Sequence, residues 1–136
     1  MNYGGCMSDQ KKSKPVIGAI EWRDLTVENA GEVKDFYSKV VGWDSSGVSM
    51  GEYEDYCVNL PGTSETVAGI CHARGENKNI PAQWLMYVRV ESVTESVEQC
   101  IKLGGEVIEG PRKLSGSDFC IIKDPAGAVL ALMSDS

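Results

Sequence analysis

The sequence predicts an α+β fold with two βαβββ modules, which together form a curved, cup-like mixed sheet with helices on the outside. The main observation behind this prediction is an internal repeat: segment 20–42 has an echo at 86–105, and a shift of the chain by 63 positions pairs their residues without a gap. A single module leaves one face of its sheet incompletely covered, so we expect two modules to close around a shared interior. The matching pairs are Val27 and Val90, Glu28 and Glu91, Glu32 and Glu95, Lys39 and Lys102, and Gly42 and Gly105.

Each half of the repeat predicts one helix. A polar residue, Asn29 or Ser92, is followed three residues later by Glu32 or Glu95, which is the spacing of a capping box. Apolar residues then recur at the helical period, so each helix should lay one apolar stripe on a sheet, and a glycine follows each helix as its end. The stripes are Ala30, Val33, Phe36, Tyr37, Val40 and Val41 in the first helix (about 30–41) and Val93, Val97, Cys100 and Ile101 in the second.

Strands are predicted before and after each helix, because these segments alternate or carry strand-favouring side chains. Two turns are expected in the second module, one at Gly110–Pro111 and one at 124–127, where proline suits the second position and glycine a positive φ. The expected strands are 16–27, 47–51, 52–60 and 66–73 in the first module (about 16–74) and 83–90, 106–108, 118–123 and 128–133 in the second (about 82–136).

The charge distribution bears on possible partners. Residues 1–15 are polar and lysine-rich without periodicity, which predicts a flexible tail before a single domain at 16–136. The 136-residue chain has a formal net charge of -7, and since the tail contributes +2, the remainder carries -9. Because this charge repels phosphates, we expect no nucleic-acid partner, whereas a neutral or cationic small molecule is acceptable.

The cysteines indicate a cellular compartment. The chain has five, an odd number without CxxC spacing, and four of them lie in segments with an apolar pattern. We therefore expect reduced core thiols. Together with the lack of a signal-peptide run or a membrane-length apolar stretch, this predicts a cytoplasmic protein that does not enter a membrane. The five are Cys6, Cys57, Cys71, Cys100 and Cys120.

Several motifs of known chemistry do not occur in the sequence. There is no GxGxxG, no GxxxxGK followed by Ser or Thr, no HExxH and no GxSxG, so dinucleotide, P-loop, metalloprotease and hydrolase sites lack their starting evidence. The only histidine is His72. Two interpretations of it stay open, a strand-end histidine bonded to backbone or water and a residue that contacts a ligand.

Three stretches carry a family resemblance. The run DFYSKVVGW at 35–43, the run GGEVIEGP at 104–111 and the run KDPAGAVLALM at 123–133, set in a repeated βαβββ plan, resemble the glyoxalase, bleomycin-resistance and extradiol-dioxygenase group, the vicinal oxygen chelate superfamily. The resemblance covers nearly the whole chain after the tail. It implies a fold more than a chemistry, because proteins of one fold do unrelated jobs. It also implies a homodimer.

The resemblance further implies where a metal ion would bind. In metal-using relatives, cavity-facing His, Gln or Glu side chains on the first and last strand of each module hold a divalent metal. The positions that match carry Trp22, Leu85 and Ala131, and the fourth falls within residues 68–70. None of these side chains is a metal ligand, so we expect no metal and no cofactor.

The same positions define an expected ligand site. If Trp22 faces the cavity, strand alternation places Asp24 on the same face, and Leu85 and Tyr87 share a face on the equivalent strand. An apolar pocket with a few polar tips is usual for a small-molecule site, although aromatic side chains can equally fill a cavity that has lost its metal. The expected ligand-binding residues are Trp22, Asp24, Tyr56, His72, Leu85, Tyr87 and Ala131.

Three functions follow as alternatives. The first is a metal-free protein that binds a small organic molecule in the cup of the sheet. The second is a lyase or isomerase related to glyoxalases or dioxygenases, with a non-standard site in which His72, Tyr87 or Asp24 acts as acid or base. The third is an interaction module with a filled cavity. The acidic residues Glu52, Glu54 and Asp55 are expected on a solvated loop face.

Overall fold

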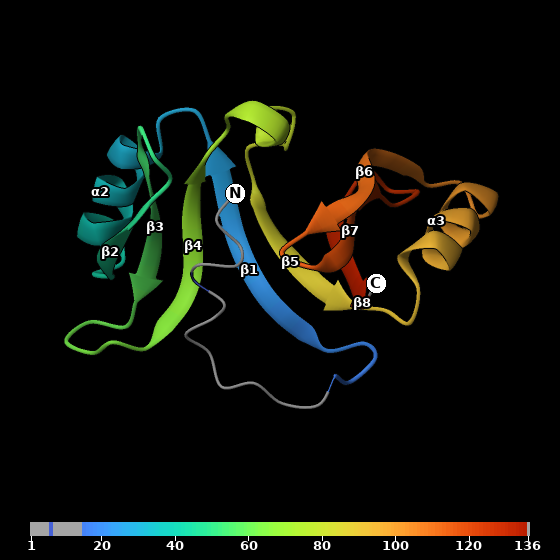
Figure 1. Ribbon diagram of the computed structural model, residues 1–136, viewed down its shortest axis with the longest axis horizontal. Helices are drawn as coiled ribbons and strands as arrows, with labels where there is room; N and C mark the ends of the chain where they lie inside the picture. The colour runs from blue at the N-terminus through green and yellow to red at the C-terminus, as the bar shows by residue number, and fades with distance from the viewer. Residues whose placement is uncertain (1–5, 7–14, 136) are drawn as a thin grey trace. The chain divides into compact units, whose positions relative to one another are not determined.

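The computed structural model describes residue 6 and residues 15–135 (Figure 1). The expected flexible tail, apart from its Cys6 and Pro15, therefore lies outside the described residues. The elements, in chain order, are β1 (Ile20–Val27), α2 (Ala30–Val40), β2 (Asp44–Ser49), β3 (Glu54–Asn59), β4 (Thr66–His72), the 3-10 turn η1 (Gly75–Asn77), β5 (Trp84–Arg89), α3 (Val93–Lys102), β6 (Glu106–Leu114), β7 (Ser117–Lys123) and β8 (Val129–Asp135).

These elements form two compact units with the same plan. The first unit holds Cys6 and residues 23–84, and the second holds residues 15–22 and 85–135. In the first, the strand order is β2-β3-β4-β1, and in the second it is β5-β8-β7-β6. Strand β1 is parallel to β4, and β5 is parallel to β8. The other pairings within the two units are antiparallel. The predicted α+β class and the repeated βαβββ plan are confirmed.

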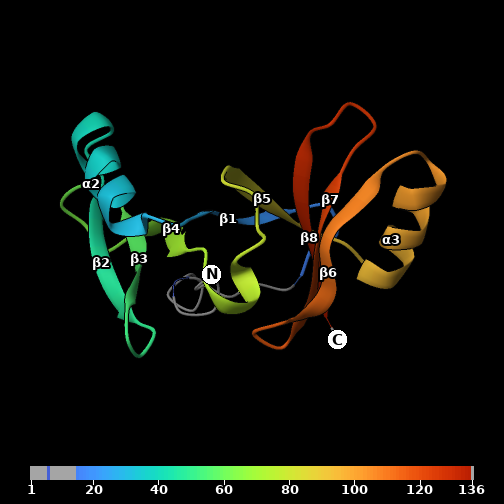
Figure 2. The ribbon, with the colours of Figure 1, turned by 90° about the horizontal axis from the view of Figure 1, so that it is seen from above.

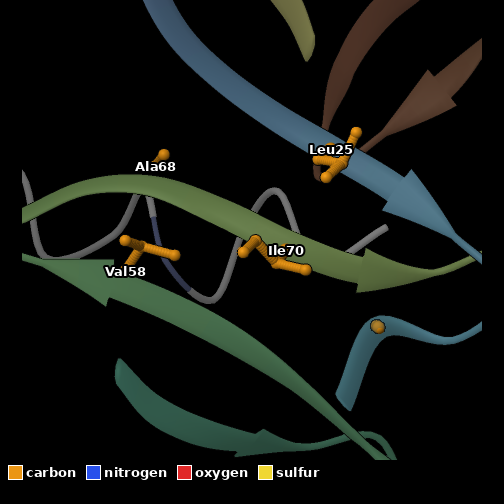
Figure 3. Packing of buried hydrophobic residues seen from close by; sticks show 5 residues of the cluster. Leu25, Val58, Ala68 and Ile70 are labelled. Carbon is orange, nitrogen blue, oxygen red and sulfur yellow. The ribbon is translucent and has the colours of Figure 1, made fainter. Parts of the chain in front are cut away.

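The first unit has its hydrophobic core between the sheet and α2, the teal helix of Figure 1. Strand alternation brings Leu25, Val58, Ala68 and Ile70 to one face (Figure 3), where they cluster with Ala30 of α2. The opposite face of these strands, which we call the reverse face of the first unit, carries the residues in between. Its members include Asp24, Thr26, Cys57 and Cys71, all of them buried.

The second unit repeats this arrangement around α3, which lies beside β6, β7 and β8 in both ribbon views (Figures 1 and 2). Val93, Cys120 and Leu132 form the cluster on the helix side. Burial raises the pKa of the Cys120 thiol to about 12, and the neighbouring Cys100 adds to the shift. Cys120 is therefore a neutral core thiol.

The two predicted helix caps differ. Ser92 has an extended backbone, and its hydroxyl accepts a hydrogen bond from the Glu95 amide at 3.2 Å, as predicted. Asn29 makes no side-chain cap bond, because its backbone (φ -108°, ψ 52°) lies outside the extended region that aims a cap side chain at the helix. The capping prediction was wrong for the first helix.

The predicted helix stripes were too wide. Phe36, Val40 and Val41 are 57%, 64% and 50% exposed, and Ile101 is 61% exposed. Ala30, Val33 and Tyr37 of α2 contact the sheet-side cluster, and these positions form a single line at helical spacing. Phe36 lies roughly 90° around the helix from this line and points past the sheet, whereas Val40 and Val41 lie at the C-terminal end of the helix.

Of the two turns predicted in the second module, one is confirmed and one is not. The 124–127 turn is confirmed, because the Asp124 carboxylate accepts bonds from the amides of Ala126 and Ala128, and Gly127 has φ 94°. Gly110–Pro111 does not end a strand as predicted. It lies inside β6, at a register shift against β7 between Glu109 and Arg112, so that a bulge carries the strand on.

One cysteine pair departs from the expected reduced state. Cys6 and Cys57 form a disulfide across a sequence separation of 51 residues, and both are buried. Cys71, Cys100 and Cys120 form no disulfide with a described residue. The expectation of five reduced thiols was therefore wrong for Cys6 and Cys57. Cys57 lies on the reverse face of the first unit, where it bonds to Cys6, a residue of the segment that the sequence predicted to be a tail. No helix among the described residues is long and apolar enough to cross a membrane.

Candidate functional site

The predicted site residues of the second unit lie together on the face of its sheet opposite α3. Tyr87 on β5 and Ala131 on β8 are register partners, and Leu85 precedes Tyr87 on the same side of the strand. All three are at most 1% exposed. The Tyr87 ring stacks on Phe119 with centroids 5.9 Å apart, so this part of the predicted site is closely packed.

Two residues that the sequence did not single out extend this packing. Phe119 is the partner of Tyr87, and the Arg112 guanidinium lies 5.2 Å from the Phe119 ring centroid. Arg112 also donates to Glu109 at 3.1 Å. The alternation of β7 could have placed Phe119, but the bulge at Gly110–Pro111 that positions Arg112 has no sequence signal beyond the Gly-Pro pair.

Strand β1 carries a row of buried polar groups. Trp22, Asp24 and Thr26 alternate along one side of the strand, and each is at most 1% exposed. Among the described residues, neither the Trp22 indole nitrogen Nε1 nor the Thr26 hydroxyl has a hydrogen-bond partner. Buried polar groups are nearly always bonded, so these two atoms indicate a partner of another kind, such as water or a ligand.

A carboxylate and an imidazole meet in the first unit. Asp55 Oδ1 accepts a bond from the His72 amide at 2.8 Å and lies 3.3 Å from the ring nitrogen Nδ1. The Asp55 side chain is fully buried and that of His72 is 18% exposed. The expectation that Asp55 lies on a solvated loop face was wrong. The residue lies within β3, where its carboxylate accepts a hydrogen bond from the backbone amide of His72 at the end of β4. Its second oxygen, Oδ2, has no hydrogen-bond partner among the described residues.

Aromatic rings surround this pair. The Tyr53 ring centroid is 5.3 Å from that of His72, edge to face, and the Tyr56 centroid is 6.2 Å away. Two cations lie over these rings, Arg74 at 4.1 Å from the Tyr53 centroid and Lys34 at 4.8 Å from that of Tyr56. Each cation is stabilised by the negative face of a ring.

The structure therefore brings some predicted site residues together and separates others. Tyr56 and His72 are neighbours, and Tyr56 packs against the α2-side cluster. Asp24 belongs to the reverse face of the same unit, where it is the register partner of Gly69. Within the first unit, Asp24 and Tyr56 thus lie on opposite faces of the sheet.

The side chains at the expected metal positions do not fit a metal ion. Trp22, Leu85 and Ala131 are fully buried or nearly so, and none of them carries a donor that binds a divalent metal. On β4, Gly69 shares the reverse face with Asp24 and has no side chain. Within residue 6 and residues 15–135, no three His, Cys, Asp or Glu side chains are grouped closely enough to hold a metal.

Comparison with known proteins adds the family context. The family model described as Glyoxalase/Bleomycin resistance protein/Dioxygenase superfamily matches residues 17–132. No curated protein sequence matches the chain significantly.

The similar solved structures have low sequence identity. A methylmalonyl-CoA epimerase from Streptomyces coelicolor is 14% identical, with 89% of this chain and 96% of that chain covered and a TM-score of 0.50. The epimerase from Mycobacterium tuberculosis is 12% identical, covers 95% of both chains and gives a TM-score of 0.49. A superfamily member from Vibrio splendidus 12B01 is 11% identical, with coverage of 84% and 97% and a TM-score of 0.49. At these identities the likeness concerns the fold.

Proposed function

We propose that this chain, which belongs to the glyoxalase/bleomycin resistance protein/dioxygenase superfamily, binds a small organic molecule without a metal ion. The observation that carries the proposal is the row on β1, where the Trp22 indole N–H and the Thr26 hydroxyl are buried without a partner among the described residues. A buried polar group left unbonded costs roughly 1–3 kcal/mol, so a ligand that bonds these atoms recovers that free energy. The apolar residues at the expected metal positions support binding without a metal.

The unpartnered atoms define the chemistry of the ligand. Trp22 Nε1 only donates, whereas Asp55 Oδ2 as a carboxylate oxygen only accepts, and the Thr26 hydroxyl does both. Thr26 is the register partner of Cys71, and Asp55 binds the amide of the next residue, His72. Thr26 and Asp55, in the first unit, therefore favour a ligand that carries a hydroxyl or amine group, and Trp22, in the second unit, favours a carbonyl-type acceptor.

Replacement of the Thr26 hydroxyl tests whether it is unsatisfied in the ligand-free protein. We expect Thr26→Val, which has nearly the same shape, to raise the free energy of unfolding by about 1 kcal/mol, because it removes a buried group without a protein partner. The matched control is Thr66→Val in the same unit, where the buried hydroxyl donates to Asn59 Oδ1 at 2.9 Å. This control should lose about 1–2 kcal/mol. Urea denaturation measures both, and a loss in Thr26→Val as large as in Thr66→Val would contradict the assignment.

Binding itself is tested by native mass spectrometry of the purified protein, with elemental analysis for metal. We expect a co-purified organic mass and less than stoichiometric zinc, nickel, manganese or iron. Trp22→Phe should reduce the bound fraction, whereas Trp84→Phe should not, because Trp84 Nε1 already donates to the Tyr37 hydroxyl at 3.0 Å. Retention of the same mass by the Trp22 variant would remove the proposed site.

The Asp55 and His72 pair favours a second candidate function, metal-independent proton transfer. A buried carboxylate beside the ring nitrogen Nδ1 orients an imidazole for acid or base work. Incubation with methylmalonyl-CoA in D2O separates the two functions for this substrate, since that is the compound class named for the structural relatives. The binding function predicts no deuterium uptake, and uptake that is lost in His72→Gln would favour the enzyme. The expected homodimer and cytoplasmic location stay predictions, the first measurable by analytical ultracentrifugation.

A further inference from the structure

A pocket lies on the α3 side of the second unit, and none of its lining residues belongs to the candidate site or to the proposed function. Its volume is about 450 Å³, within the range usual for small-molecule sites. One helix face forms one wall and the 124–127 turn forms the other, while side chains of the second-unit core form the floor. The lining residues are Val90, Glu91, Ser92, Glu95, Ser96, Gln99, Cys100, Leu103, Gly105, Ile122, Asp124, Pro125 and Leu132.

The bottom of this pocket and the edges of its opening are apolar. Val90, Ile122 and Leu132 belong to or pack against the core cluster beneath α3. Leu103, at the end of the helix, is 70% exposed, and together with Pro125 of the facing turn it gives the opening apolar edges. A hydrophobic chain of a few carbons placed between Leu103 and Pro125 would be shielded from water on two sides, which favours its binding.

The charged groups of the lining are all of one sign. Glu91, Glu95 and Asp124 contribute carboxylates, and no lysine or arginine of residues 15–135 lines the pocket. Asp124 already accepts two amide bonds through Oδ1, whereas Glu91 and Glu95 are exposed. A carboxylate pair beside an apolar slot favours a cation that carries an apolar chain and disfavours the corresponding anion.

We propose that this pocket binds small amphiphilic organic cations, with the apolar chain between Leu103 and Pro125 and the cationic group beside Glu91 and Glu95. None of the pocket residues belongs to the β1 row. The result of the experiments on this pocket therefore neither supports nor contradicts the proposed function.

The proposal is tested by isothermal titration of the full chain with three probes of similar length, hexyltrimethylammonium, heptanoate and 1-heptanol. We expect the cation to bind at least tenfold more tightly than the anion, with the alcohol in between. Equal affinity for cation and anion would overturn the charge argument.

Variants locate the binding. The double variant Glu91→Gln with Glu95→Gln should weaken the cation about tenfold and leave the alcohol unchanged, whereas Glu98→Gln, on the same helix but outside the lining, should change neither. Ser96→Phe should fill the pocket and abolish binding of all three probes. Leu103→Ser, at an exposed position that does not threaten folding, should weaken the cation and the alcohol alike. Unchanged binding in both Ser96→Phe and Leu103→Ser would overturn the site.

Cys100 gives a direct readout at the pocket. Its thiol lines the site and is half-buried, with Sγ 3.7 Å from the Glu106 carbonyl oxygen. Hexyltrimethylammonium should slow labelling of Cys100 by N-ethylmaleimide in proportion to its occupancy, as followed by peptide mass spectrometry. Labelling at an unchanged rate under saturating probe would place the bound cation elsewhere.

Discussion

Loss of the Cys6–Cys57 disulfide is expected to lower the free energy of unfolding by about 4 kcal/mol. The bond closes a loop with a sequence separation of 51 residues, and the loop-closure entropy removed from the unfolded chain gives this magnitude. We expect the loss both in Cys6→Ser and in the native sequence treated with dithiothreitol. Urea denaturation followed by circular dichroism measures it.

The two treatments control each other. Dithiothreitol should have no further effect on Cys6→Ser, because Cys57 has then lost its partner and the other three cysteines form no disulfide with a described residue. If reduction leaves the native midpoint unchanged, or if it lowers Cys6→Ser as much as the native sequence, the disulfide does not contribute as proposed. A residue near the N-terminus would then be dispensable for the stability of the first unit.

The disulfide also bears on the reverse face of the first unit. Cys57 lies on that face, which also carries Thr26, and Cys6 is fully buried against it. If reduction frees this face, binding of a small molecule at the β1 row should change with redox state, whereas Thr26→Val should lose binding in either state. The native mass measurement, repeated with dithiothreitol, compares the two.

The repeat explains why the elements could be predicted. A gapless shift aligns both strand-helix starts, and both helices are found within a residue or two of the expected limits. Patterns of this kind depend on neighbours in the sequence. Whether Phe36 or Ile101 is covered depends on how much sheet the helix meets, and that is decided by strands distant in sequence.

The candidate site shows the same division. Alternation correctly grouped Tyr87 with Leu85, because both lie on one strand. The link between Asp55 and His72 could not be read from the sequence, since it depends on the register between β3 and β4. The pairing of Cys6 with Cys57 was likewise invisible, because an odd cysteine count leaves every pairing open.

A buried guanidinium gives the second large expected effect. Arg89 is 8% exposed, and it donates to Glu21 Oε1 from Nε at 3.2 Å and from Nη2 at 2.8 Å, and to Asp135 at 2.8 Å from Nη1. The bond to Glu21 raises the pKa of Arg89 more than burial lowers it. Because the pKa of Arg89 is higher in the folded protein than in the unfolded chain, the stability that the charged guanidinium contributes is complete below the unfolded-state pKa. It is lost only as the pH rises through the folded-state pKa, so it should be constant between roughly pH 6 and 9.

We expect Arg89→Leu to lower the free energy of unfolding by about 2–3 kcal/mol, because it leaves the Glu21 carboxylate half-buried without its partner. The double variant Glu21→Leu with Arg89→Leu should recover part of this loss, since the lone carboxylate is then gone. The matched control is Lys113→Leu, whose ion pair with Asp118 has a lysine side chain that is 65% exposed; it should change stability by less than about 0.5 kcal/mol. Urea denaturation at neutral pH compares the three. An Arg89→Leu effect no larger than that of Lys113→Leu would show that the buried guanidinium does not stabilise the second unit.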